Sequence, residues 1–351
     1  MSTPQAYSFS DAVLYFFKVL GRRPGATLWV GLWNGLLYLT VGALIVITLW
    51  PFYEQMIALA LSDQDPEAAD IFAMMAAMSG FMVAAFFGGI LMALMAQGAW
   101  LRLLARDEVA PLIPLRFGSD ELRLLGVNAL FLLLAGAAYV VMAVGVVVVG
   151  LIIAGIGAAG SELGAGIAGG LVAFVFVLAL IAATAFVAIR FAPAPALSVL
   201  DRKMRFFDAW PVTRGIFWWA LLTYIVMGIM VFSAAAVLGS MAQLLYLPAV
   251  FPVLAEFVEH SQTHSGELAP QEAFDLLWSG LTHPAAIVFI VLGTAATLML
   301  QVFYEGAWHS VGAYLARRHR GLESEPETVQ PSPVPAPQTG DAGNDSGSSA
   351  T

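Results

Sequence analysis

The charge-free stretch from residue 124 to residue 161 reads LLGVNALFLLLAGAAYVVMAVGVVVVGLIIAGIGAAGS and decides the fold class. It runs for 38 residues without Asp, Glu, Lys or Arg, whereas roughly 20 apolar residues suffice to cross the hydrocarbon core of a bilayer. Because a helix satisfies its own backbone hydrogen bonds in lipid, such a stretch predicts a transmembrane helix. Five more charge-free stretches of at least 27 residues occur: 24–53, 71–101, 163–189, 215–255 and 276–304.

The composition of the whole chain agrees with six membrane spans. Of its 351 residues, 60% are hydrophobic and 11% are charged, whereas about 25% are charged in an ordinary soluble domain. The chain has no cysteine, which excludes disulfides, thiol catalysis and iron–sulfur clusters. We predict an all-α integral membrane helical bundle with six transmembrane helices arranged as three hairpins. The predicted spans are 26–50, 74–101, 124–153, 165–189, 216–243 and 285–308.

The charged residues are divided between the two ends of these spans. All 15 Lys and Arg residues lie before the first span, in the even-to-odd connectors or after the sixth span, and the three opposite connectors hold 11 acids and no base. Because cytoplasmic loops of membrane proteins are enriched in Lys and Arg, both termini are predicted to be cytoplasmic. The net charge of −9 disfavours a nucleic-acid partner.

The spans divide the chain into three regions. Residues 1–25 are predicted to be a cytoplasmic interfacial segment, and residues 26–320 form the six-span transmembrane domain. Residues 321–351 are rich in Pro, Gly, Ser and acids and have no aromatic residue. Such a composition cannot bury enough apolar surface to fold, so this region is predicted to be a disordered cytoplasmic tail.

Short amphipathic segments precede the odd-numbered spans and follow span five. Residues 9–20 place Phe9, Phe16 and Leu20 on one helical face with Lys18 on another, and residues 196–210 mix aromatic and aliphatic residues with cations. Such segments typically lie in the headgroup region. Residues 252–264 and 271–281 are predicted to be amphipathic helices on the opposite side of the membrane.

Small residues recur at a spacing of four within the spans, which allows close helix contact in lipid. Structural packing is the interpretation we adopt for these pairs: Gly31/Gly35, Ala84/Gly88, Ala85/Gly89, Gly166/Gly170 and Ala235/Gly239. Gly155, Gly157 and Gly160 match the dinucleotide-binding fingerprint in spacing. They end a stretch of membrane length, however, and the fingerprint requires a turn between a strand and a helix.

Two groups of charged residues are the candidate sites. Arg190 ends span four and Glu305 lies near the end of span six, so the two could form an intramembrane polar pair. Solvation of each at the interface, or a proton or substrate relay, are the alternatives. Arg202, Lys203 and Arg205 could contact anionic lipid headgroups, or they could act as topology signals only.

No catalytic, cofactor-binding or metal site is predicted. Glu256, His260 and His264 stand at intervals of four residues, a spacing that could hold a divalent metal, but a solvated helix face produces the same pattern. The sequence does not decide between the two. We expect no cofactor.

The segments Arg190–Leu197 and Phe207–Trp218 carry a family resemblance. They resemble the multi-pass membrane domain found beside some glycerophosphoryl diester phosphodiesterases and in standalone bacterial proteins, and the similarity extends over roughly residues 7–318. The resemblance implies the same helical fold and a bacterial inner membrane. It implies no hydrolase activity, because the soluble phosphodiesterase barrel is absent.

The function expected from these observations is not enzymatic. No nucleophile, base and metal ligands converge in the sequence, so we expect a multi-pass protein that organises membrane lipids, which could be anionic, or a partner membrane protein. The alternative is a small-molecule transporter or channel, which requires a polar path between the hairpins. The sequence does not predict an oligomeric state.

Overall fold

The computed structural model describes residues 6–61, 67–159, 162–263 and 270–322, and no strand occurs in these ranges. Six of the helices are long and apolar enough to cross a membrane. The prediction of a helical membrane protein with six spans is therefore confirmed. The six helices are α3 (Pro24–Leu61), α4 (Ala68–Leu101), α5 (Ser119–Ala159), α6 (Glu162–Phe191), α9 (Phe217–Leu244) and α12 (Pro284–His319).

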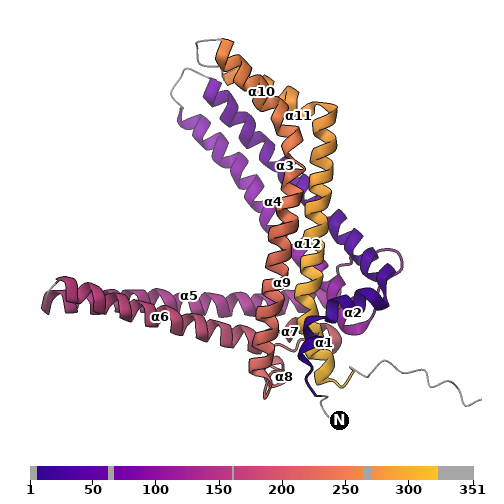
Figure 1. Cartoon of the computed structure of the whole chain (residues 1–351), viewed down its shortest axis with the longest axis vertical. Helices are drawn as coiled ribbons and strands as arrows, with labels where there is room; N and C mark the ends of the chain where they lie inside the picture. The colour runs from indigo at the N-terminus through magenta and orange to yellow at the C-terminus, as the bar shows by residue number, and fades with distance from the viewer. Residues whose placement is uncertain (1–5, 62–66, 160–161, 264–269, 323–351) are drawn as a thin grey trace, which may run out of the picture.

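These helices pair into three arms, α3–α4, α5–α6 and α9–α12, that diverge from one end of the molecule (Figure 1). The α5–α6 arm leaves this end in a direction far from that of the other two arms. Two further helices, α10 (Leu247–Thr263) and α11 (Pro270–Thr282), connect α9 to α12 at the far end. They match the two amphipathic helices that the sequence predicts there. The arms are hairpins, as predicted, but they are splayed rather than gathered into a compact bundle.

The buried core lies where the arms meet, in a region that we call the junction. Five short helices pack there against the last turns of α12: α1 (Phe9–Val13), α2 (Tyr15–Arg22), the π-helix η1 (Arg102–Arg106), α7 (Ala194–Leu200) and α8 (Ala209–Val212). Large side chains that are almost fully buried there include Phe16, Trp100, Leu197 and Tyr314. The junction is therefore the part of the protein that is held together by its own packing.

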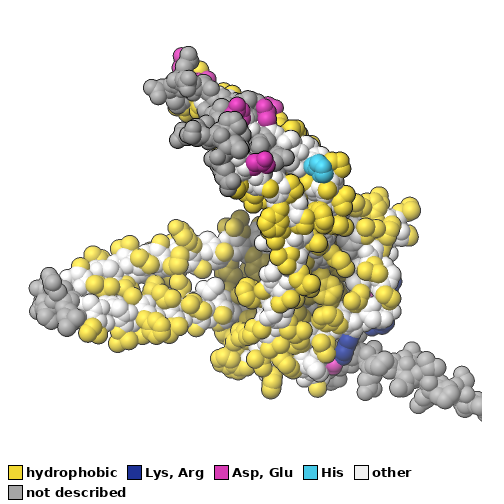
Figure 2. Space-filling view, turned by 45° about the horizontal axis from the view of Figure 1, so that its top comes forward, with side chains coloured by type: hydrophobic (Ala, Val, Ile, Leu, Met, Phe, Trp, Pro, Cys, Tyr) yellow, Lys and Arg dark blue, Asp and Glu magenta, His cyan; other side chains and the backbone are white. Residues whose placement is uncertain are grey.

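The arms, in contrast, expose apolar side chains around their whole circumference. On α5 the exposed fraction is 74% for Leu132 and 61% for Val147, and on α6 it is 63% for Leu171. A helix that is apolar all round is suited to a protein core or to lipid. Figure 2 shows hydrophobic side chains over the arms, with acidic groups gathered at the far end of the upper arms. Such exposed apolar surface is suited to contact with lipid in helices long enough to cross a membrane.

The arms are also longer than a bilayer core is thick. The 41 residues of α5 extend about 60 Å at 1.5 Å per residue, whereas the hydrocarbon core measures about 30 Å. A helix longer than the core can tilt, and its charge-free part alone is nearly twice the core thickness. Arms that diverge steeply must be tilted in a membrane, and a tilted span has to be longer than an upright one. The length of the charge-free stretches agrees with this tilt.

The predicted interfacial segments are placed differently from our expectation. Residues 9–20 form two helices broken at Leu14, and Phe16 of the predicted apolar face is buried against protein, as is Val19. Tyr15 is also buried, and its hydroxyl donates to the Leu104 carbonyl at 2.9 Å. The first part of residues 196–210 is buried as α7. An apolar helical face in the sequence shows only that lipid or protein covers that face. In this segment, protein covers part of it.

Tyrosine side chains attach the N-terminal segment to the arms. The Tyr7 hydroxyl is hydrogen-bonded to Thr223 of α9, and the Ser8 amide donates to the Tyr314 hydroxyl of α12 at 3.1 Å. Burial raises the pKa of the Tyr7 phenol above its ordinary value.

The small-residue pairs are used unevenly. Gly31 and Gly35 face Val302 of α12, as a packing pair should, and a Cβ at Gly31 would lie 3.2 Å from Val302. Gly166 and Gly170 have nothing within 4 Å of the Cβ position. Their neighbour Gly169 is the close contact instead, because a Cβ there would lie 2.7 Å from Ile153 of α5.

Candidate functional site

A buried group of ion pairs joins η1 to the start of α5 in the junction. The Arg102 guanidinium pairs with Glu121 and donates to the Pro114 carbonyl at 3.0 Å. The side chains of Arg102 and Glu121 are only 5% and 1% exposed. Gly98 makes room for this pair, since a side chain at that position would overlap the Glu121 carboxylate. We call this group, with Arg106, Asp120 and Arg123, the junction ion pairs.

The remaining members extend the connection to α7. Asp120 accepts hydrogen bonds from Arg106 at 2.7 Å and from Arg123 at 2.7 Å. Arg106 also donates to the Val199 carbonyl of α7 at 3.1 Å. Buried charges are tolerated when they are paired and hydrogen-bonded in this way. The junction ion pairs therefore attach the α5–α6 arm to the rest of the protein by its first turn.

A cavity of about 240 Å³ lies beside these ion pairs, where the three arms diverge. We call it the junction cavity. Each arm contributes to its wall, together with the corner between α6 and α7. Its lining residues are Gln97, Leu101, Asn128, Phe131, Ala192, Pro195, Ala196, Tyr224, Trp308, His309 and Gly312.

The polar groups of the junction cavity are two side-chain amides, a phenol, an indole and an imidazole. The Asn128 amide donates to the Gln97 side-chain oxygen at 2.9 Å, which links α5 to α4 across the cavity wall. Tyr224 contributes a phenol and His309 an imidazole from the two helices of the third arm. Of the described residues that line it, none is Lys, Arg, Asp or Glu. Such a wall matches ligand groups that are polar but neutral, such as hydroxyls and esters.

The structure does not join Arg190 to Glu305. The Arg190 guanidinium carbon lies 5.2 Å, 5.2 Å and 5.3 Å from the ring centres of Phe186, Trp210 and Phe217. Its remaining polar contact is with the Thr213 hydroxyl, at 3.3 Å. We call these three rings the Arg190 cage. A cation over aromatic faces is stabilised by the ring quadrupoles, so this arginine has no need of a carboxylate.

Glu305 is instead bonded to α3. The Tyr38 hydroxyl donates to one of its carboxylate oxygens, while the other oxygen is buried without a hydrogen-bond partner. Asn34, one helical turn before Tyr38, is fully buried and its amide also has no partner. The polar contact that the sequence assigns to α6 and α12 thus lies between α3 and α12.

The three cations predicted to contact anionic lipid differ from one another in the structure. Arg202 pairs with Glu108 at 2.9 Å, and Arg205 pairs with Asp208 at 2.8 Å. Lys203 is exposed, and it has no acidic partner in the described part of the chain. Two of these three cations are therefore paired with the protein's own acids.

The possible metal-binding face cannot be followed in the structure. His264 lies outside the described residues, as do the side chains of Glu256 and His260. Over the ranges that are described, no group of three or more His, Cys, Asp or Glu residues could hold a metal ion. The tail from residue 323 also lies outside the described residues.

The junction ion pairs and the junction cavity are not predicted by the sequence. From the sequence, Arg102 and Arg106 are interpreted only as topology signals. Their spacing of four nevertheless places both on one helical face. Asp120 and Glu121 stand in the first turn of α5, where acids are favoured by the helix dipole. The approach of the two groups depends on the connector of residues 107–118, whose path the sequence does not reveal.

Fold and site together define the class of protein: a multi-pass membrane protein whose arms diverge from a packed, ion-paired junction. Comparison with known protein families, with curated proteins and with solved structures gives no match to this chain.

Proposed function

We propose that this protein binds and organises glycerolipid, holding the polar glycerol region of a lipid in the junction cavity and its acyl chains between the splayed arms. The single observation that carries the proposal is the neutral, polar cavity at the point where three apolar arms separate. The proposal includes a bacterial inner membrane, cytoplasmic termini and no enzymatic activity. The proposal also includes a partner membrane protein. Lipid held between the arms would form much of the surface that such a partner contacts.

The exposed faces of the arms support lipid between them. Phe232 of α9 is 76% exposed, and Phe87 of α4 is 64% exposed. No hydrophobic force drives such helices together in a bilayer, because lipid chains are as apolar as leucine. Arms held apart by a rigid junction therefore leave space that acyl chains fill.

The depth of the junction cavity suits the glycerol and ester region. Asn128 follows Arg123 by five residues, about 8 Å along the helix axis. In this proposal Arg123 lies at the level of the headgroups, and the Asn128 and Gln97 amides lie beneath it, at the level of the ester oxygens of a glycerolipid. A neutral wall favours these oxygens over a phosphate, which would require Lys or Arg.

We also propose that the chain is a standalone relative of the membrane domain it resembles, on the segments Arg190–Leu197 and Phe207–Trp218. Contact with anionic lipid is proposed for Lys203, with smaller contributions from the ion-paired Arg202 and Arg205.

Replacing both amides of the cavity tests the proposed function. The double variant Gln97→Leu/Asn128→Leu removes two polar groups together, so neither is left unpaired and the fold should be retained. Two lost hydrogen bonds of about 1 kcal/mol each predict retention of glycerolipid weaker by at least about tenfold. Mass spectrometry of the lipids that copurify with the protein in mild detergent measures this change.

The matched control is Gln243→Leu/Gln301→Leu, which removes two exposed amides from α9 and α12 outside the cavity. This control should retain lipid like the unaltered protein. Equal retention by both double variants, with equal helicity, would contradict the proposal. Uptake of a small solute by vesicles that contain the protein would favour the transporter instead.

The orientation is tested with single cysteines, since the chain has none of its own. Glu67→Cys and Glu272→Cys should react with an impermeant maleimide in intact cells, because both are exposed at the acidic ends of the arms. Arg116→Cys and Lys203→Cys, exposed at the junction, should react only after the membrane is opened. The reverse pattern would refute cytoplasmic termini.

A further inference from the structure

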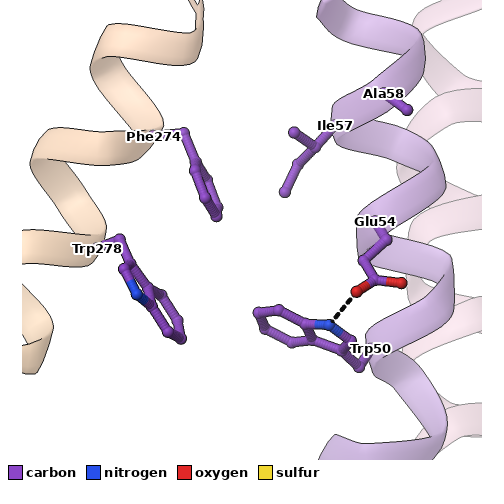
Figure 3. Close-up of a pocket in the computed structure, with 6 residues that line it drawn as sticks. All are labelled: Trp50, Glu54, Ile57, Ala58, Phe274 and Trp278. Carbon is purple, nitrogen blue, oxygen red and sulfur yellow. Dashed lines mark hydrogen bonds between the residues drawn. The ribbon is translucent and has the colours of Figure 1, made fainter.

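A second cavity, of about 420 Å³, lies between α3 and α11 at the end of the molecule farthest from the junction. Figure 3 shows Phe274 and Trp278 of α11 facing Trp50, Glu54 and Ile57 of α3. We call this cavity the aromatic cleft. It shares no residue with the junction cavity, so a ligand in the cleft is independent of the proposed function.

Three aromatic rings form the walls of the aromatic cleft. The ring centres of Trp50 and Trp278 are 6.0 Å apart, and their planes are inclined at 53°. Phe274 is stacked nearly parallel to Trp278, with the ring centres 6.3 Å apart. Trp50 and Trp278 remain 40% and 50% exposed, so both side chains are accessible from outside the protein.

The aromatic cleft also contains the carboxylate of Glu54, which can accept further hydrogen bonds or pair with a cation. The Trp50 indole N–H donates to Glu54 Oε1 at 2.5 Å, which holds the carboxylate beside the rings (Figure 3). No Lys or Arg in the described residues pairs with Glu54. The sequence explains why, because the three connectors at this end of the arms contain no basic residue. The positive charge that this carboxylate attracts must therefore come from outside the chain.

We propose that the aromatic cleft binds an organic ammonium cation. Aromatic faces attract such cations through their quadrupoles and recognise quaternary ammonium groups in particular, and a carboxylate adds a full opposite charge. Trp50 follows Arg23 by 27 residues, about 40 Å along α3, so the cleft lies near the membrane surface opposite the junction. The ammonium group of an ethanolamine or choline lipid, or a soluble amine, has the required chemistry.

The competing interpretation is that Trp50 and Trp278 only anchor the helices at the membrane surface, as tryptophan commonly does. Anchoring requires no saturable cation site and no carboxylate. Equilibrium dialysis of the full-length protein against labelled choline, at constant ionic strength set with sodium chloride, distinguishes the two. We expect saturable binding by the unaltered protein.

Variants locate the bound choline. Glu54→Gln removes the charge and Trp278→Leu removes a wall, and each should weaken choline binding at least tenfold. Glu272→Gln is the matched control, because it removes an exposed acid of α11 that does not line the cleft, and it should bind like the unaltered protein. Absence of saturable binding in the unaltered protein, or equal weakening by Glu54→Gln and Glu272→Gln, would overturn the proposal.

A second experiment identifies the source of the cation. The protein is placed in nanodiscs of phosphatidylglycerol alone or of phosphatidylglycerol with phosphatidylethanolamine. If phosphatidylethanolamine lowers choline binding severalfold in the unaltered protein, the cleft binds a lipid headgroup. If choline binds equally in both, the cleft binds a soluble amine. Loss of saturable choline binding in phosphatidylglycerol discs would contradict either source.

Discussion

Replacing Glu121 with leucine is expected to lower the free energy of unfolding by about 3–5 kcal/mol, the largest effect of any single substitution considered for this protein. The substitution leaves the Arg102 guanidinium, 5% exposed, without its carboxylate. Asp120 compensates only in part, because it lies 3.9 Å from Arg102 and is already bonded to Arg106 and Arg123. Unfolding of the purified protein, followed by circular dichroism in detergent, measures the change.

Two comparisons separate the loss of a buried partner from the loss of a contact. The double variant Arg102→Met/Glu121→Leu removes both charges, so much of the stability lost in the single variant should return. Asp11→Asn breaks the exposed pair with Lys18 and should cost less than about 1 kcal/mol. A Glu121→Leu variant no less stable than Asp11→Asn would mean that the junction ion pairs do not hold the arms.

The spans were predictable because one physical quantity decides them. A lipid core excludes charge, so the absence of Asp, Glu, Lys and Arg over 38 residues from Leu124 onward identifies a membrane helix without any tertiary information. The same reasoning gives the hairpins, since basic and acidic connectors alternate. It does not give the angle between arms, which depends on how η1, α5 and α7 meet in the junction.

The junction could not be predicted because its patterns have two physical causes. A helical apolar face such as that of Phe16 and Leu20 arises whether lipid or protein covers it, and the structure packs both residues against protein. Likewise, Arg102 and Arg106 satisfy the positive-inside rule whether they face water or a buried carboxylate. Only the positions of the partners, Asp120 and Glu121, distinguish these cases.

Arg190 illustrates a further reason, which is that charges need not pair with charges. The sequence suggests Glu305 as its partner because an acid stands near the same end of another span. The structure satisfies the cation with the rings of Phe186, Trp210 and Phe217 instead. A count of charged residues does not register ring quadrupoles, although Phe186 stands four residues before Arg190, Trp210 in the following connector and Phe217 at the start of the next span.

Replacing Arg190 with methionine is therefore expected to lower the free energy of unfolding by about 2–3 kcal/mol. Methionine keeps the length and apolar stem of the side chain but removes the cation, and a desolvated cation–π contact contributes about 2 kcal/mol. Loss of the hydrogen bond to Thr213 adds about 1 kcal/mol. Arg190→Lys should fall between the two proteins, because it keeps the charge without the planar guanidinium.

Double-mutant cycles identify which partner stabilises Arg190. The effects of Arg190→Met and Trp210→Leu on the free energy of unfolding should be non-additive by about 1 kcal/mol or more. Once Arg190→Met has removed the cation, the Trp210 ring has no cation left to stabilise. Arg190→Met and Glu305→Gln should instead be additive within about 0.5 kcal/mol, since the structure gives these residues separate partners. The reverse result, coupling to Glu305 and none to Trp210, would restore the ion pair and displace the Arg190 cage. Because both cycles share the variant Arg190→Met and the same unfolding assay, a general loss of stability cannot produce the difference between them.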